Sequence, residues 1–168
     1  MINCLHTSND VLRQAPAVRR GRAIRLCGRL VPVLLAFIAK DAWSACSVNA
    51  QGVNFGSYDP LGGSSLDGAG NVALTCSLGT VYTIALSSGG GTLASRVMSN
   101  GPYSLHYNLY ADALRIFVWG DGKGGTVTVS GIGVGLAATN VTVYGRIPAA
   151  QNVHVGNYSD NVIVTVTF

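Results

Sequence analysis

Several residue types and motifs are scarce or missing, and each absence narrows the possible functions. Residues 46–168 contain no glutamate, and charged residues make up only 11% of the whole chain. A surface with so few charges is typical of a protein that packs against copies of itself or against partners. No Cys-x-x-Cys pair is present, so neither a redox motif nor a zinc site is indicated.

Enzyme motifs are missing as well. The glycine-rich stretches 120–125 and 131–135 have no Gly-Lys-Ser or Gly-Lys-Thr after them and no βαβ pattern around them, which argues against a phosphate loop. No residues form a recognisable pair of nucleophile and base. We therefore predict that the protein is not an enzyme and that it binds no cofactor.

The few titratable side chains have structural explanations. His106 and His154 are the only histidines after residue 45, and neither has the spacing of a metal site. We expect a structural or surface role for both. Four aspartates stand beside Gly, Pro or Asn, which indicates side-chain hydrogen bonds in turns rather than a calcium loop. They are Asp59, Asp67, Asp121 and Asp160.

The basic character of the chain is confined to its N-terminal segment. Residues 1–45 hold seven of the eleven Lys and Arg residues and two of the seven acidic residues. Residues 46–168 then carry four basic and five acidic residues, a net charge of −1. The net charge of +4 for the whole chain is therefore no indication of a nucleic-acid partner.

The same N-terminal segment has the pattern of a secretory signal. Five arginines within residues 19–29 precede an apolar stretch, residues 30–39, that is too short to span a bilayer comfortably. An N-terminal membrane anchor is the alternative, and Pro32 and the short length argue against it. Small residues at 42 and 44 favour cleavage after Ser44, with cleavage after Ala45 as the second choice. We predict that residues 1–45 are removed on export and that residues 46–168 form one domain.

Two cysteines remain after this predicted cleavage, Cys46 and Cys76. An even pair in an exported chain indicates one disulfide, with two free buried thiols as the alternative. Such a bond would tie the first predicted strand to the end of the second. The loop-entropy estimate for its contribution to the free energy of unfolding is roughly 3 kcal/mol.

Residues 46–168 have the texture of an all-β domain. Short runs rich in Val, Thr, Ile and Tyr alternate with Gly, Asn, Ser and Asp, and regular turn signals favour a β-sandwich. We expect two hairpins, one of 71–76 with 81–86 and one of 105–110 with 114–119. The predicted strands cover residues 46–55, 71–76, 81–86, 105–110, 114–119, 126–130, 139–147 and 160–168.

The last predicted strand runs to the end of the sequence. Val162, Val164, Val166 and Phe168 alternate with polar or outward residues and share one face of this strand. With no following element, we expect an unpaired edge and an uncovered apolar face, which is a template for a strand of another chain. The sequence therefore predicts strand exchange with a partner rather than catalysis.

Short segments through residues 46–168 carry a family resemblance by their order and spacing. They are Cys46-Ser47-Val48, Phe55-Gly56-Ser57-Tyr58-Asp59-Pro60, Val72-Ala73-Leu74-Thr75-Cys76, Tyr82-Thr83-Ile84-Ala85-Leu86-Ser87, Leu105-His106-Tyr107-Asn108-Leu109-Tyr110, Trp119-Gly120-Asp121-Gly122, Val143-Tyr144-Gly145-Arg146-Ile147-Pro148, Gly156-Asn157-Tyr158-Ser159-Asp160 and Val166-Thr167-Phe168. Together they resemble the spore coat protein U domain, which is shared with subunits of archaic, Csu-type chaperone–usher pili.

The resemblance implies an incomplete, pilin-like immunoglobulin β-sandwich that lacks its final strand. It also implies that a periplasmic chaperone lends a strand, which the N-terminal extension of the next pilus subunit later replaces. By analogy, Val162, Val164, Val166 and Phe168 lie at the chaperone contact and flank the groove for the donor strand. The expected partners are this chaperone, an outer-membrane usher and neighbouring pilus subunits. The expected location is the cell surface, a pilus or the medium, reached through the periplasm.

One departure from the family pattern predicts a special position in the fibre. Subunits that polymerise carry a donor segment, on the order of ten or more residues, before the first cysteine. Cleavage directly before Cys46 would leave a tail of one or two residues, which cannot span a groove at ~3.3 Å per residue. Such a subunit accepts a strand but donates none, so we predict a tip or capping position with a role in cell adhesion and biofilm formation.

Two other functions fit the same residues. One is a coat-type surface protein that does not form a donor-strand fibre. The other is a secreted carbohydrate-binding module that uses Trp119 and surface tyrosines. A requirement for a chaperone separates the pilus subunit from both of them.

Overall fold

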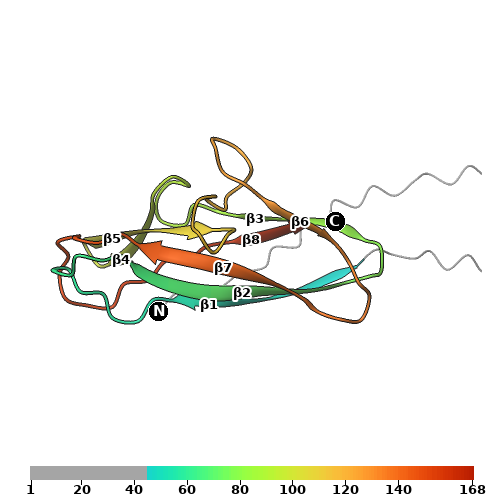
Figure 1. Cartoon of the computed structure of the whole chain (residues 1–168), viewed down its shortest axis with the longest axis horizontal. Helices are drawn as coiled ribbons and strands as arrows, with labels where there is room; N and C mark the ends of the chain where they lie inside the picture. Colours follow the sequence, from blue (N-terminus) through green and yellow to red (C-terminus); the bar gives the residue numbers. More distant parts are fainter. Residues whose placement is uncertain (1–44) are drawn as a thin grey trace, which may run out of the picture. The chain divides into compact units, whose positions relative to one another are not determined.

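Eight strands make up the part of the chain that the computed structural model describes, residues 45–168 (Figure 1). Val, Thr, Ile and Tyr dominate them, and turns rich in Gly, Ser and Asn separate them. The strands are β1 (Cys46–Asn54), β2 (Leu66–Cys76), β3 (Val81–Leu86), β4 (Arg96–Asn100), β5 (Tyr103–Tyr110), β6 (Val129–Ile132), β7 (Thr139–Ile147) and β8 (Val164–Thr167). The predicted signal segment and its cleavage site at Ser44 lie outside the described residues.

The strands form two sheets with one core between them. The first sheet has the order β1-β2-β7-β5-β4 and the second the order β6-β3-β8, and every pairing of strands within them is antiparallel. Figure 1 shows β1, β2 and β7 below β3, β6 and β8. Alternate residues of each strand point inward, and Leu74, Ile84 and Trp119 are among those that are almost completely buried. The all-β, pilin-like sandwich predicted from the sequence is confirmed.

The structure also contains the predicted disulfide. Cys46 and Cys76 are Cα partners in the β1–β2 ladder, and their sulfur atoms are 2.05 Å apart. The chain then passes through the turn 77–80 into β3, which belongs to the other sheet. Because β2 and β3 lie in different sheets, the expected hairpin of 71–76 with 81–86 is wrong. The turn connects the two layers instead.

The second expected hairpin forms only in part. Val118 makes an antiparallel bridge with Tyr110, and the Ala111 and Trp119 N–H groups donate to the carbonyls of Phe117 and Leu109 at 3.0 and 2.9 Å. Residues 114–116 form a loop, so no named strand covers 114–119. Arg115 has a φ of 58°, and the Asp112 carboxylate accepts hydrogen bonds from the backbone N–H groups of Ile116 and Phe117 at 2.8–3.2 Å. These bonds fix a loop, because the N–H groups that a strand would use are already satisfied. The ladders of β5 are with β4 and β7.

Other boundaries differ in ways that matter for function. β4 was not predicted, and β2 begins at Leu66, inside the expected glycine-rich loop. β6 lies a few residues later than expected, and β8 is limited to Val164–Thr167. The Ser87 N–H donates to the Ile163 carbonyl at 3.0 Å, which continues the β3–β8 pairing by one residue, whereas Ser159 forms a bridge with Ser99 of β4.

A buried arginine joins the two sheets on one side of the core. Arg96 has an exposed fraction of 0%, and its guanidinium donates to the carbonyls of Ser87 and Trp119 and to Oδ1 of Asn108 at 2.6–3.1 Å. Burial lowers the pKa of Arg96. A buried cation costs little only when its donors are satisfied in this way. Trp119 adds a bond from its indole N–H to the carbonyl of Ile84 at 3.0 Å.

Candidate strand-acceptor seam

Bridges and hydrogen bonds join the two sheets at several places within residues 45–168. On the β4 side, the Ser99–Ser159 bridge attaches the first sheet to the segment that leads into β8. On the β6 side, Trp119 bridges to Val127, and the Leu86 N–H donates to the Gly120 carbonyl. In residues 45–168, no ladder or bridge joins β1 to β8. The outer edges of these two strands are therefore where the sandwich is incomplete.

The predicted interface residues lie on one face of the C-terminal segment, as expected from their alternation. Val162 and Val164 are 5% and 3% exposed and belong to the core. Val166 is half-buried, and Phe168 is 43% exposed. Burial therefore falls toward the C-terminal end of β8. The structure brings the four side chains together, and their contact with a chaperone or donor strand stays a prediction.

The facing strand shows the same gradient. Cys46, Val48 and Ala50 point toward the core but are only half-buried, whereas Val53, beyond a register shift in β1, is 3% exposed. The half-buried ends of the two strands meet at the same end of the sandwich. Cys46 is bonded to Cys76, and the short turn 77–80 leads to β3, whose Thr83 pairs with Thr167.

We call the half-buried residues Cys46, Val48, Ala50 and Val166, the exposed Phe168 and the two strand edges the open seam. All five side chains are apolar, and each edge strand presents every second N–H and C=O of its backbone away from its sheet. An extended segment with alternating apolar residues would satisfy both features at once, by pairing with the edges and covering the inward face.

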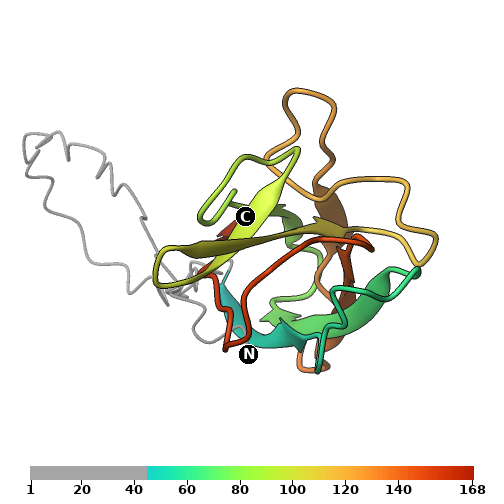
Figure 2. The same cartoon turned by 90° about the vertical axis from the view of Figure 1, so that its left-hand side faces the viewer.

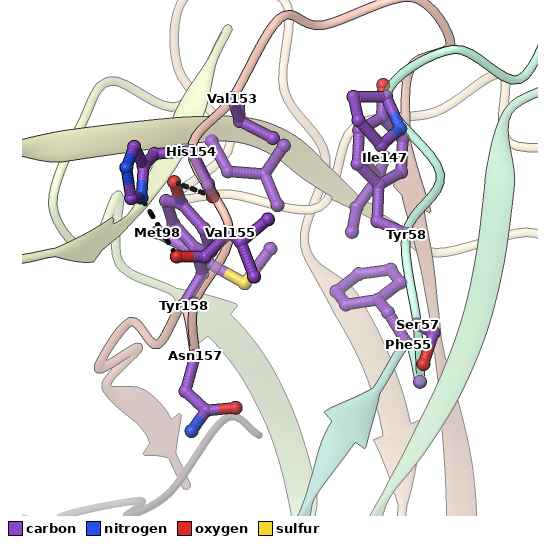
Figure 3. Close-up of a pocket in the computed structure, with 14 residues that line it drawn as sticks. Phe55, Ser57, Tyr58, Met98, Ile147, Val153, His154, Val155, Asn157 and Tyr158 are labelled. Atoms are coloured by element: carbon purple, nitrogen blue, oxygen red, sulfur yellow. Dashed lines mark hydrogen bonds between the residues drawn. The ribbon is translucent and has the colours of Figure 1, made fainter.

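The opposite end of the sandwich contains a cavity of about 270 Å³. Phe55, Met98 and Ile147 contribute apolar walls from the first sheet, and the segment 153–158 covers it (Figure 3). Its volume is below the range of most small-molecule pockets. The cavity has room for one or two side chains, and its lining combines apolar residues with the polar Ser57, His154 and Asn157.

Hydrogen bonds hold the cover of this cavity in place. The Tyr58 hydroxyl donates to the Pro148 carbonyl at 2.9 Å and accepts from the Gln151 N–H at 2.8 Å. Tyr158 donates to the His154 carbonyl at 2.8 Å, as one dashed line in Figure 3 shows. The His154 ring also stacks on Tyr103, with ring centroids 4.4 Å apart. Figure 2, which looks at this end, shows the connection from β7 to β8 running across it.

Charged groups lie away from the open seam. On the outer face of the first sheet, Asp67 accepts two hydrogen bonds from Arg146 at 2.7 and 2.9 Å, and Arg115 lies 3.2 Å away. The bond from Arg146 and the nearby charge of Arg115 lower the pKa of Asp67. Backbone N–H bonds from Phe117 and Ile116 lower the pKa of Asp112 in the same direction. None of these groups faces the core.

Three of the four aspartates predicted to form turn hydrogen bonds do so. The carboxylates of Asp59, Asp121 and Asp160 each accept a backbone N–H within two residues, as expected for turns. Asp67 is the exception, because it lies inside β2 and forms ion pairs. His106 and His154 are exposed. Within residues 45–168, no three His, Cys, Asp or Glu side chains are placed to hold a metal ion.

Trp119 cannot serve as a sugar-binding surface. Its exposed fraction is 0% and its indole N–H is bonded to Ile84, so neither the ring face nor the donor is accessible. The carbohydrate-binding alternative loses the aromatic residue on which it depended. Across the described residues there is also no helix long and apolar enough to cross a membrane.

Comparisons with known proteins agree with this geometry. The chain matches the profile of the family described as "Spore Coat Protein U domain" over residues 34–165. It is 35% identical over 142 residues to "Protein U" of Myxococcus xanthus, an alignment that covers 74% of this chain and 78% of that protein.

A solved structure supports the fold. It is the crystal structure of the CsuC–CsuE chaperone–tip adhesion subunit pre-assembly complex from archaic chaperone-usher Csu pili of Acinetobacter baumannii. The TM-score is 0.55 at 23% identity, and the match covers 74% of this chain and 40% of that one. At this identity the likeness shows the fold alone, and this chain spans about two fifths of the solved chain.

Proposed function

The chain belongs to the Spore Coat Protein U domain family, and on that premise we propose that it is a structural subunit of a surface fibre or coat. A strand from a partner protein completes the sandwich by lying between β1 and β8. The partner is first a periplasmic chaperone and then a neighbouring subunit, added at an outer-membrane usher. Export through the periplasm to the cell surface follows from this assembly route.

The open seam is the observation that carries this proposal. Every other junction between the two sheets has its own bridges, backbone bonds or buried side-chain bonds, including those of Arg96. Along the seam, by contrast, apolar side chains such as Val48 and Val166 remain half-exposed. Fully burying an aliphatic side chain contributes about 1.5–3 kcal/mol, so a strand that covers several of them binds with substantial free energy. Edge pairing adds hydrogen bonds and sets the register.

The seam also defines the chemistry of its occupant. A donor segment needs apolar residues at every second position, because only alternate side chains of a strand face the core. The cavity near Phe55 and Met98 would receive an apolar side chain at one end of that segment. The similar solved structure is a complex of a pilus subunit with a chaperone, which supports the view that a subunit of this fold is held by a chaperone before assembly.

The proposed place in the fibre is the tip or a capping position. It depends on cleavage after Ser44 or Ala45, which would leave no segment to donate. The family match begins at residue 34, upstream of that cleavage site. The mature N-terminus therefore decides between the two positions: a start at Ala45 or Cys46 gives an acceptor-only subunit, and an earlier start gives a repeating one.

A matched pair of substitutions in β8 tests the proposed function. Val166→Asp would place a charge in the filled seam, where burial without a partner is strongly unfavourable. Thr165→Asp changes the neighbouring, exposed residue that points outward. We expect Val166→Asp to reduce the amount of co-purifying chaperone or subunit at least tenfold, measured by quantitative mass spectrometry, and Thr165→Asp to leave it within twofold of wild type.

Protease resistance separates loss of binding from loss of folding. Resistance of the remaining Val166→Asp protein equal to that of Thr165→Asp shows that the domain still forms. Equal recovery of partners with both variants would rule out the seam as the binding site. A stable, partner-free wild-type monomer would instead favour the non-polymerising coat protein.

A further inference from the structure

A second apolar surface lies at the end of the sandwich where the seam is open. Five large hydrophobic side chains there are more than half exposed, which is unusual for a soluble domain unless a partner covers them. We call this surface the apolar platform. Its members are Leu78 (81% exposed), Val81 (65%), Ile132 (61%), Val134 (56%) and Leu136 (101%).

Two segments build the platform side by side. Val81 and Ile132 are Cα partners in the β3–β6 ladder. Beyond them, the Gly79 N–H donates to the Gly133 carbonyl at 2.9 Å, and the Gly133 N–H donates to the Thr80 carbonyl at 2.7 Å. The residues of the platform therefore come from the turn after β2 and from the connection that leaves β6.

The backbone under the platform is fixed. The Gly135 N–H donates to the Cys76 carbonyl at 3.1 Å, and Cys76 is held by the disulfide. Gly133 has no room for a side chain, because a Cβ there would clash with the Ser77 carbonyl oxygen. A pre-organised surface of this kind loses little conformational entropy when a partner docks on it.

No charged residue occurs in either of these segments, 76–81 and 129–139. Charged residues normally protect exposed apolar edges from unwanted association. At the closed end, Leu61 is 94% and Val155 is 92% exposed, two residues against the five of the platform. The platform thus has the composition of an interface core rather than that of a solvated turn.

The two ends of the seam differ in whether a strand bound there can continue beyond the end of the sandwich. At the cavity end, the segment 148–158 crosses the end of the sandwich and is fastened to Tyr58 (Figure 2). At the other end, where β1 begins and β8 ends, the described chain crosses between the sheets by the short turn 77–80, which joins β2 to β3 rather than β1 to β8. A strand that fills the seam can end at the cavity, but its connection to a folded domain has to emerge beside the platform.

We propose that the platform is the docking surface for the folded domain that donates the strand, a neighbouring subunit of the same family. This inference rests on the proposed function. The strand gives the affinity of the pair, and the platform fixes the orientation of one subunit against the next. The partner surface is apolar, since Leu78, Ile132 and Leu136 offer no charge to pair with.

Photo-crosslinking in the assembled protein tests the proposal. Benzoyl-phenylalanine would replace Phe168 in the seam, Leu136 in the platform or Leu61 at the closed end, one at a time. We expect positions 168 and 136 to capture the same neighbouring subunit and position 61 to capture none. The adduct at 168 should map to the donated strand and the adduct at 136 to the folded domain behind it.

The outcomes separate the two proposals. If position 168 captures a subunit strand while 136 captures nothing, or captures only that strand, the platform inference is overturned and the proposed function stands. Capture at 61 as strong as at 136 also overturns the inference. If position 168 captures no partner, the proposed function itself fails.

Exposed-residue variants give an independent measurement. Replacing both Leu78 and Leu136 by Ser should leave the domain folded, since both side chains are in solvent, yet speed dissociation of the subunit pair at least tenfold. Binding of a synthetic peptide with the sequence of the captured strand should stay within twofold, because the peptide has no domain to dock. Leu61→Ser is the matched control and should match wild type in both assays. Dissociation of the double variant at the wild-type rate would contradict the proposal.

Discussion

The two long sides of this sandwich differ in how the edges of the two sheets are joined. On the Arg96 side, a buried guanidinium, three carbonyl or amide acceptors and several bridges join the sheets from within the chain. On the seam side, β1 and β8 present unpaired edges over half-buried residues such as Ala50 and Val166. Only the disulfide reinforces that side of the described chain, at one end. The difference indicates that one side is built for folding and the other for a partner.

The largest expected effect on the free energy of unfolding comes from a substitution on the Arg96 side. Arg96→Met removes the guanidinium and leaves the Ser87 and Trp119 carbonyls without this donor, while Oδ1 of Asn108 keeps only the bond from the Leu109 N–H. Orphaned buried polar groups cost about 1–3 kcal/mol each, so we expect a loss of roughly 3 kcal/mol or more in the free energy of unfolding. Denaturant unfolding of the exported protein measures it. Arg146→Met, on the outer face, should cost less than ~1 kcal/mol, and equal losses for the two variants would refute the role given to Arg96.

The disulfide is the next most important support, because it is a covalent tie beside the open seam. Cys46→Ser should lower the free energy of unfolding by roughly 3 kcal/mol, since the unfolded chain regains the entropy of a 30-residue separation. We expect faster proteolysis of the variant in the partner-free state. Protease resistance equal to wild type would mean that the bond contributes nothing to the seam side.

The smallest expected effect concerns the Asp67 ion pairs, which belong to neither side. Arg146 and Arg115 hold the pKa of Asp67 below its ordinary value of 3.8. The carboxylate therefore contributes stability that is present above the pKa of the unfolded chain and is lost as pH falls through the lower pKa of the folded protein. Asp67 is partly exposed, so Asp67→Asn should cost less than ~1 kcal/mol at pH 7. The cost should shrink in unfolding curves as pH falls below 3.8 and through the lower pKa of the folded protein, and a cost that grows with acidification would contradict this assignment.

Long, regularly alternating strands were predictable from the sequence. The bounds 81–86 and 139–147 match β3 and β7, and the cysteine pair and the family resemblance are confirmed. Pattern alone could not tell that the turn 77–80 changes sheets, because a hairpin and a crossover can use the same residues. The apolar run 114–119 predicted a strand. Asp112 overrides that preference at Ile116 and Phe117 by binding their N–H groups, and only the end of the run, at Val118, bridges to β5.

The two sides of the sandwich were predictable to different degrees. The four alternating apolar residues from Val162 to Phe168, two of which belong to the seam, followed from period-two reasoning. β4 did not, because its sequence begins with an arginine, which normally lies at the surface, and only the acceptors from three distant segments make its burial favourable. The cavity likewise depends on segments around 58, 98, 147 and 155 that no local pattern brings together.

The most direct test of the central claim is a crystal or electron-microscopy structure of the exported protein as it is recovered from producing cells. The account predicts an extended segment of another polypeptide between β1 and β8, paired with at least one of these edges and covering Val48, Ala50 and Val166. A stable monomer in which β1 and β8 pair directly with each other would contradict it.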